Sequence, residues 1–253
     1  GIKLIEIQKS TGYSMRKSLS VKEIKNIIAE IRKIDKEVII MVDNCYGEFV
    51  EEFEPISVGA DVMISSLMKN LGAGIATSGG YVVGKKEYIH YIAERLTAPT
   101  LGKEEGANFN QLITYYKGLF FAPSVVASAL KTQIYASYML EKLGYIASPK
   151  WNEKRCDIIE RITFNDKDKL IKFCQGIQKG GPIESNITPM PSPMAGYDRN
   201  IIMAGATFTP GATIELSCDG PVAEPFTAYM QGGLTFPFGR LGILIALNNM
   251  IGE

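Results

Sequence analysis

The chain has 253 residues, of which 46% are hydrophobic and 21% are charged, and these ordinary globular values allow one large domain or two modest ones. Its 27 basic and 27 acidic residues balance, so charge gives no case for a nucleic-acid or anionic-membrane partner. No apolar run approaches the roughly 18 residues of a membrane helix. The four cysteines are scattered without a C-x-x-C pair, which argues against a disulfide framework or a metal site and for reduced thiols in the cytoplasm.

The chain opens with a strand, a helix and a second strand. Lys3–Gln8 reads as a buried strand, and Val21–Ile34 carries isoleucines at helical spacing. Ser20 followed by Glu23 three residues later forms a capping box that starts this helix. Val38–Val42 is wholly apolar and mostly β-branched, as expected of a strand buried on both faces of a parallel sheet. The order predicts a βαβ unit with parallel strands.

Polar residues follow two of the predicted strands. Asp43 directly follows the strand Val38–Val42, and a weaker run, Val62–Ile64, leads through two serines to Lys69. Open parallel sheets bind ligands beyond the carboxyl ends of their strands, so Asp43 and Lys69 are expected on one rim although 69 − 43 = 26 positions separate them. An acid and a lysine with hydroxyls beside it suit pyridoxal phosphate, because the lysine bonds the aldehyde and the carboxylate pairs with the ring nitrogen.

The rest of the chain is predicted as a further strand, two helices and a compact C-terminal part. Residues 98–108 show no clear period, and the proline-rich segment 182–193 cannot form a regular element. We predict a division into 1–143 and 144–253. The expected elements are strand Tyr81–Val83, helix Lys85 to about Leu96, a long helix from about Pro123 to Leu143 ending at Gly144, strands Cys156–Phe164, Ile201–Ala206 and Thr213–Ser217, and helices Asp166–Gln178 and Leu241–Ile251.

Several motifs, taken together, resemble the Cys/Met-metabolism group of pyridoxal-phosphate enzymes: Val42-Asp43-Asn44, Gly59-Ala60-Asp61-Val62, Ser66-Leu67-Met68-Lys69-Asn70 and Gly79-Gly80-Tyr81-Val82-Val83. Three others resemble one branch of that group: Ile7-Gln8-Lys9-Ser10-Thr11-Gly12-Tyr13-Ser14, Arg95-Leu96-Thr97-Ala98-Pro99 and Gln231-Gly232-Gly233-Leu234-Thr235. That branch carries the names methionine gamma-lyase-like, carbon–sulfur lyase and aluminum resistance protein.

The resemblance implies a fold and an assembly. The fold is the α/β type I (aspartate aminotransferase-like) fold, with a mixed, mostly parallel sheet in a large domain and a smaller α+β C-terminal domain. In that fold an earlier segment carries the first strand, a glycine-rich phosphate loop and an aromatic residue that stacks on the cofactor. We therefore expect this chain to be the C-terminal portion of a longer protein. A homodimer or homotetramer is also expected.

The resemblance also implies roles for individual residues. Ser66 stands where the family contacts the cofactor phosphate. Met68 departs from the family, which commonly has a second phosphate-binding hydroxyl there, and Ser65 is a possible substitute. Asn44 and the two residues after it are expected to line the pocket rim, beside Asp43 and Lys69.

The arginine that binds the substrate carboxylate in the wider family is missing from its expected place. That arginine precedes a Leu-Ser pair in a small-domain strand, and the corresponding stretch here is Ile214-Glu215-Leu216-Ser217, with an acid instead. Either another arginine takes the role or the substrate differs. Arg95 and Arg240 are the candidates.

The function expected from the resemblance is β- or γ-elimination on a sulfur amino acid of the cystathionine or methionine type, with Lys69 as general base on the Cα proton. Transamination, racemisation and aldol cleavage fit the same two residues, and a non-catalytic stress-response protein stays open because the arginine is missing. The only histidine, His90, lies on a charged helix, so a Ser-His-Asp or Cys-His hydrolase is not expected.

Overall fold

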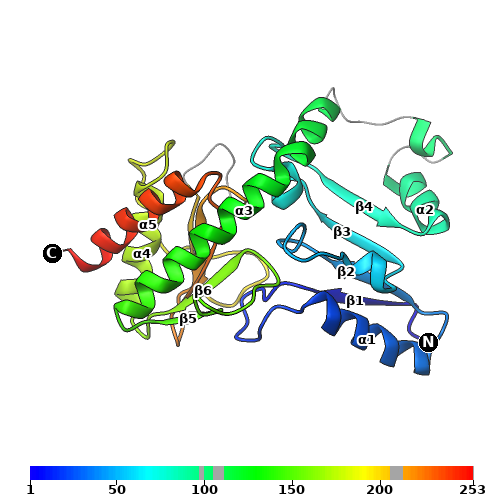
Figure 1. The fold of residues 1–253 in the computed structure, drawn as a ribbon, viewed down its shortest axis with the longest axis horizontal. Coiled ribbons are helices and arrows are strands. Elements are labelled where there is room, and N and C mark those ends of the chain that lie inside the picture. The colour runs from blue at the N-terminus through cyan, green and yellow to red at the C-terminus, as the bar shows by residue number, and fades with distance from the viewer. Residues whose placement is uncertain (97–99, 105–110, 206–212, 253) are drawn as a thin grey trace.

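The structure, a computed structural model, describes residues 1–96, 100–104, 111–205 and 213–252. These residues form two β-sheets, five α-helices and three short 3-10 helices. Figure 1 shows the long helix α3 (Leu112–Lys142) running from beside the first sheet to the second. Among the described helices, none has the length and apolar character needed to span a bilayer.

The first sheet is mixed and mostly parallel, as predicted. Its strand order is β1 (Leu4–Gln8), β2 (Ile39–Asp43), β3 (Val62–Ser66), β4 (Gly80–Gly84). The first three strands run parallel and β4 is antiparallel to β3. The carboxyl ends of β1, β2 and β3 therefore meet at one edge.

Helix α1 (Val21–Ile34) covers one face of this sheet. Its capping box is complete: the Glu23 amide donates to Ser20 Oγ at 3.2 Å, and the Ser20 amide donates to Glu23 Oε2 at 2.7 Å. The apolar stripe of the helix, with Ile24 fully buried, packs against Ile40 and Val42 of β2. The βαβ order and the parallel pairing are confirmed, because local capping and apolar spacing both specified them. The predicted burial of the first strand is wrong, since in β1 only Ile7 is buried and Leu4 is exposed.

Helix α3 begins 11 positions before the predicted start at Pro123. The proline lies inside the helix, where it removes one main-chain donor without ending the helix. The helix packs its Gly118 against the short helix η2 (Asn70–Gly72), which follows Lys69. A Cβ on Gly118 would lie 2.6 Å from the carbonyl oxygen of Gly72, so the two backbones approach closely there.

The second sheet is antiparallel throughout, and α3, α4 and α5 pack on it around a core that includes Phe173, Ile202 and Met230. The three-residue β5 and the strand β9 were not predicted. The proposed division after Leu143 falls at the C-terminal end of α3 and stays a prediction. The elements of this part are β5 (Ile146–Ser148), β6 (Ile159–Thr163), α4 (Lys167–Lys179), β7 (Ile201–Ala204), β8 (Ser217–Pro221), β9 (Thr227–Gln231) and α5 (Phe236–Ile251), and the sheet order is β5-β6-β9-β8-β7.

The predicted strand Thr213–Ser217 is wrong, because the structure has bends over residues 214–216 and β8 begins only at Ser217. The backbone of Ile214 bonds to loops instead. Its amide donates to the carbonyl of Met68 at 3.2 Å, and its carbonyl accepts from Gly233 at 2.9 Å. This segment therefore joins the second sheet to the loop that carries Lys69.

Two other predicted starts shift. The strand expected from Cys156 is β6, which begins at Ile159. The helix expected from Leu241 begins at Phe236, after Thr235 caps it. The predicted end of the strand at Ala206, and most of residues 98–108, lie outside the described residues. The helix α2 (Lys86–Leu96), predicted from Lys85, and the short helices η1 (Pro55–Val58) and η3 (Gly102–Glu104) complete the described elements.

Candidate active site

The candidate site lies at the edge where the carboxyl ends of β1, β2 and β3 meet. Asp43 is the last residue of β2 and is paired in register with Gln8 and Ile64. The half-buried Asp43 carboxylate accepts a hydrogen bond from the Cys45 amide at 2.9 Å, which orients it at the strand end. The structure thus places Asp43 on the predicted rim.

Lys69 lies three residues beyond β3, just before η2. Its Nζ is 5.1 Å from the ring centroid of Tyr46, which follows Asp43 by three positions. Tyr46 holds a left-handed backbone with φ of 71°, a conformation that is rare outside glycine. Burial raises the pKa of the neighbouring Cys45 thiol, and the Lys69 ammonium opposes that rise. The lysine and the segment after Asp43 are therefore neighbours, as predicted from the rim argument.

The two serines before Lys69 point to different partners. Ser65 Oγ donates to Cys45 Sγ at 3.4 Å. Ser66 Oγ accepts from the Met68 amide at 3.1 Å, so it also orders the turn that leads to the lysine. Both serines stand at the end of β3, and their predicted contact with a cofactor phosphate stays a prediction.

Asn44 is fully buried below the rim. Its Nδ2 donates to Glu54 Oε2 at 2.8 Å, and its Oδ1 is buried without a hydrogen-bond partner in the described part of the chain. A Cβ on Gly47 would lie 2.6 Å from that oxygen. These contacts give Asn44 a role in holding the loop after β2, and its predicted contact with a cofactor stays a prediction.

The second sheet supplies an acidic wall that sequence reasoning did not find. Asp219 of β8 is buried and accepts a short hydrogen bond from the hydroxyl of Tyr13, in the loop after β1. Burial raises the pKa of Asp219 to about 6, against hydrogen bonds from Tyr13 and Gln231 and the charge of Lys69. The charge of Lys69 is the smallest of these effects on the pKa of Asp219.

Tyr13 is fixed by aromatic neighbours as well as by Asp219. Its ring centroid is 5.2 Å from that of Tyr197 and 5.2 Å from that of Tyr229 on β9. Burial is the main cause that raises the pKa of the Tyr13 phenol, and the nearby Asp219 carboxylate raises it further. Tyr13 therefore stays a neutral hydrogen-bond donor at physiological pH.

Arg161 is the arginine tied to this group of residues. It lies on β6, buried, and its guanidinium donates to the Ser14 carbonyl at 3.2 Å and to Ser148 Oγ at 2.7 Å. The predicted candidates lie elsewhere in the fold. Arg95 is exposed in the last turn of α2 (Lys86–Leu96), and Arg240 is exposed on α5 with its guanidinium 5.9 Å from the Tyr135 ring. Their contact with a substrate stays a prediction.

The acid that replaces the expected arginine is buried near the lysine loop. Glu215 is 1% exposed, and its Cγ lies 3.5 Å from the Cβ position of Gly74. It lies between the bend at Ile214, which bonds to Met68, and the start of β8. The carboxylate is thus part of the packing between the second sheet and the segment after Lys69.

Comparison with known proteins places this site in a group of related chains. YnbB of Bacillus subtilis (strain 168), an uncharacterized protein, is 47% identical over 98% of this chain and 59% of its own length. A structure from Clostridium acetobutylicum, described as a proposed cystathionine beta-lyase involved in aluminum resistance, has a TM-score of 0.93 and 50% identity, covering 99% of this chain and 58% of that one. A carbon–sulfur lyase involved in aluminum resistance from Clostridium novyi NT has a TM-score of 0.91 and 47% identity, covering 99% and 58%.

The fold with its lysine-bearing rim therefore has the architecture of structures described as carbon–sulfur lyases. The methionine gamma-lyase family model matches residues 1–251. The chain belongs to the methionine gamma-lyase family, which confirms the resemblance of its motifs, and membership of that family implies pyridoxal phosphate as cofactor. The chain spans about three fifths of the length of YnbB and of these two structures.

Proposed function

We propose that the protein is a pyridoxal-phosphate-dependent carbon–sulfur lyase that carries out β- or γ-elimination on a sulfur amino acid. The printed names of the related structures support the reaction class. The observation that carries the proposal is the Lys69 amine beside the segment that follows Asp43, at the carboxyl edge of a parallel sheet. A homodimer or homotetramer in the cytoplasm is part of the same proposal.

The residues present fit the cofactor. The Lys69 amine is the group that bonds a pyridoxal aldehyde, and the Asp43 carboxylate is the group that pairs with the ring nitrogen. Ser65 and Ser66 offer hydroxyls to the phosphate from β3. Lys69 is only partly buried, and its Nζ lies over the face of the Tyr46 ring. Among the described residues, the ion pairs within 4.0 Å do not include Lys69.

Each residue then has a chemical task. When bound, pyridoxal phosphate withdraws electrons from the Cα of an amino acid. Asp43 holds the proton on the ring nitrogen, which sustains that withdrawal. Lys69, as a free amine, takes the Cα proton as general base. Asp219 and Tyr13 add a bonded pair from β8 and the loop after β1, with the phenol as a fixed neutral donor and the carboxylate as a group whose pKa lies near 6.

The test begins with the visible absorption of the purified protein mixed with pyridoxal phosphate. We expect a band of lysine-bound cofactor in the wild type, no such band in Lys69→Ala, and an unchanged band in Lys86→Ala, which removes an exposed lysine at the start of α2. An unchanged band in Lys69→Ala would refute the role of Lys69.

Incubation with cystathionine or methionine tests the reaction. Release of a keto acid with ammonia by the wild type, and its loss in Lys69→Ala, supports the lyase. Transfer of the amino group, racemisation or aldol cleavage would assign a different reaction to the same lysine. The absorption band without any turnover would favour a non-catalytic protein that binds the cofactor.

A further inference from the structure

Two segments near the lysine hold backbone conformations that are rare outside glycine. In the loop of residues 44–54, here called the Tyr46 loop, Tyr46 and Phe49 have φ of 71° and 62°. In residues 67–73, here called the lysine turn, Ala73 ends η2 with φ of 51°. Strained conformations of this kind persist only where surrounding contacts hold them, and they cluster at functional sites. Both segments therefore need contacts that fix them.

A side-chain hydrogen bond joins the two segments. Asn70, the residue after Lys69, is fully buried, and its Nδ2 donates to the backbone carbonyl of Glu48 at 2.9 Å. Glu48 follows Tyr46 by two positions, and the Asn70 carbonyl accepts from the Ala73 amide at 3.2 Å. The bond thus connects the lysine turn to the loop that carries the Tyr46 ring.

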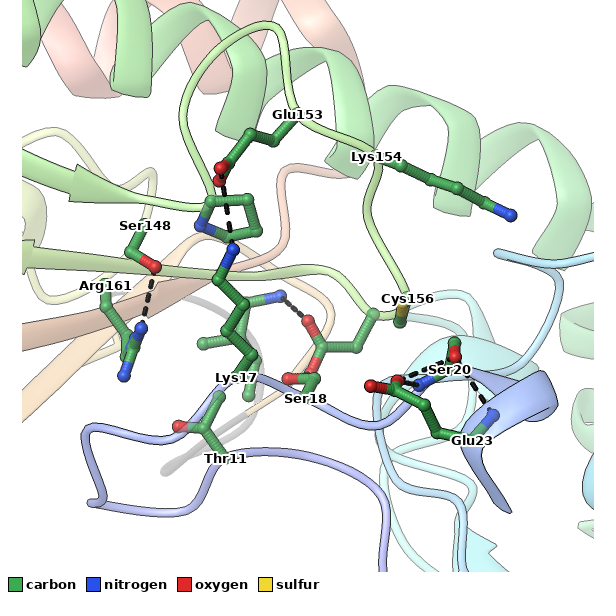
Figure 2. A pocket seen from close by; sticks show the side chains of 13 residues that line it. Thr11, Lys17, Ser18, Ser20, Glu23, Ser148, Glu153, Lys154, Cys156 and Arg161 are labelled. Atoms are coloured by element: carbon green, nitrogen blue, oxygen red, sulfur yellow. Dashed lines mark hydrogen bonds and ion pairs between the residues drawn. The ribbon is translucent and has the colours of Figure 1, made fainter. Parts of the chain in front are cut away.

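The Tyr46 loop is also anchored to the second sheet. The Tyr46 carbonyl accepts from the amide of Ile158, just before β6, at 3.1 Å. Ser18 Oγ donates to Asp157 in the same segment, which holds it to the loop after β1 (Figure 2). These bonds fix the ring side of the pair, and they do not involve the lysine turn.

The lysine turn is anchored on its other side by α3. The Lys69 carbonyl accepts from the Gly72 amide at 3.2 Å, and a Cβ on Gly118 would lie 2.6 Å from the Gly72 carbonyl oxygen. Among the hydrogen bonds of the described residues, the one from Asn70 crosses between this turn and the Tyr46 loop. It therefore sets how far the lysine stands from the ring.

The amide of Asn70 adds little to the stability of the fold. Its Oδ1 is buried without a hydrogen-bond partner in the described part of the chain. A buried acceptor that is left unpaired destabilises the folded state and offsets the bond that Nδ2 makes. What the side chain supplies is the geometry of the lysine turn.

We propose that Asn70 is a positioning residue that holds the Lys69 amine over the face of the Tyr46 ring, a role that rests on the proposed bond between Lys69 and the cofactor. The Nζ lies 5.1 Å from the ring centroid, and a ring face attracts an ammonium group. A lysine side chain is otherwise flexible. If the amine occupied the competent position for only part of the time, cofactor affinity would fall by that fraction.

The first measurement uses the protein without cofactor, so that it does not depend on lyase activity. Reductive methylation with isotope-labelled formaldehyde marks the lysine amines for NMR and keeps their charge. The signal that is missing from Lys69→Ala belongs to Lys69. We expect it upfield of its position in urea, because the face of the Tyr46 ring shields nuclei above it. This displacement reports how closely the amine stays on the ring.

Two variants remove the bond in different ways. Asn70→Asp keeps the shape of the side chain and removes its donor, and Asn70→Ala removes the amide without adding a charge. In both we expect the upfield displacement to fall by half or more. We also expect the affinity for pyridoxal phosphate, titrated by the visible band, to fall about tenfold.

Asn249→Asp is the matched control. Asn249 on α5 makes the same kind of bond, from Nδ2 to the Lys172 carbonyl at 2.8 Å, at an exposed position. We expect this variant to match the parent protein in both measurements. Circular dichroism melting checks that each variant folds, and Asn70→Ala decides the matter if the buried carboxylate of Asn70→Asp prevents folding.

An unchanged displacement in the folded Asn70 variants would overturn the proposal, and so would an equal loss in Asn249→Asp. A different result separates it from the proposed function. If the displacement is lost in the Asn70 variants while the parent protein forms no band of lysine-bound cofactor, the positioning of the amine is supported and its cofactor role is refuted.

Discussion

Glu48 offers a direct test of how the rim region is held together. It lies in the loop after β2, is 2% exposed, and accepts a hydrogen bond from the hydroxyl of Tyr81 on β4 at 2.7 Å. Its backbone carbonyl accepts from Asn70 Nδ2 at 2.9 Å, next to Lys69. Burial raises the pKa of the carboxyl from 4.5 to about 7, and hydrogen bonds from Ser65 and Tyr81 oppose that rise only in part.

The raised pKa of Glu48 determines in which direction, and by how much, its contribution to the free energy of unfolding changes with pH. Between pH 4.5 and 7 the folded protein keeps a proton that the unfolded chain releases, so this group's contribution to stability is present below pH 4.5 and is lost as the pH rises through 7. At 1.36 kcal/mol per pKa unit, the loss amounts to about 3 kcal/mol. In Glu48→Gln the side chain cannot ionise and its amide oxygen can still accept from the Tyr81 hydroxyl, so the variant does not lose this stability as the pH rises.

The assay is urea unfolding of wild type and Glu48→Gln at pH 5 and pH 8. The variant is expected to gain about 2.5 kcal/mol on the wild type between the two pH values, because part of the loss is already present at pH 5. The double difference cancels every carboxyl that both proteins share. Glu52→Gln, an exposed position of the same loop, is expected to show no such gain. If Glu48→Gln and wild type lose stability in parallel from pH 5 to pH 8, the reasoning from burial is wrong.

Two further predictions concern close contacts. Arg155 and Glu160 form a buried ion pair at 2.6 Å, in which the guanidinium opposes the rise that burial gives the pKa of Glu160. Arg155→Leu is expected to cost about 3 kcal/mol or more in urea unfolding, and a second change, Glu160→Leu, to recover most of it; no recovery would contradict this account. Gly118→Ala places a methyl 2.6 Å from the Gly72 carbonyl and is expected to lower thermal stability and cofactor affinity, although alanine favours helix by about 1 kcal/mol. A more stable variant with unchanged affinity would show that the backbones separate freely.

The first sheet could be predicted because its signals are local. The capping box at Ser20 and the apolar run before Asp43 each specify an element within a few residues, and the rule for parallel strand ends then places Asp43 and Lys69 on one edge. The predicted start of α3 at Pro123 was wrong, because the first turns of that helix are largely exposed and show only a weak pattern of apolar spacing.

The second wall of the site could not be read from the sequence. Tyr13, Asp219 and Arg161 come from three distant segments, and only the packing of the second sheet against the loop after β1 brings them together. The strand β9, Thr-Ala-Tyr-Met-Gln, has too few β-branched residues to stand out, although it is buried throughout. The one local signal was the Gly12-Tyr13-Ser14 motif of the family branch. This motif drew attention to Tyr13 but gave no indication that Asp219 is its hydrogen-bond partner.

The long helix α3 has a mechanical consequence. It extends over about 46 Å for its 31 residues, touching η2 beside Lys69 near one end and β5, β6 and α5 toward the other. Between these two contact regions lies Pro123, which has no main-chain N–H and so removes one hydrogen bond of the helix. A change in the angle between the two sheets would therefore bend α3 first at Pro123, and the bend would displace Gly72 in the turn that follows Lys69.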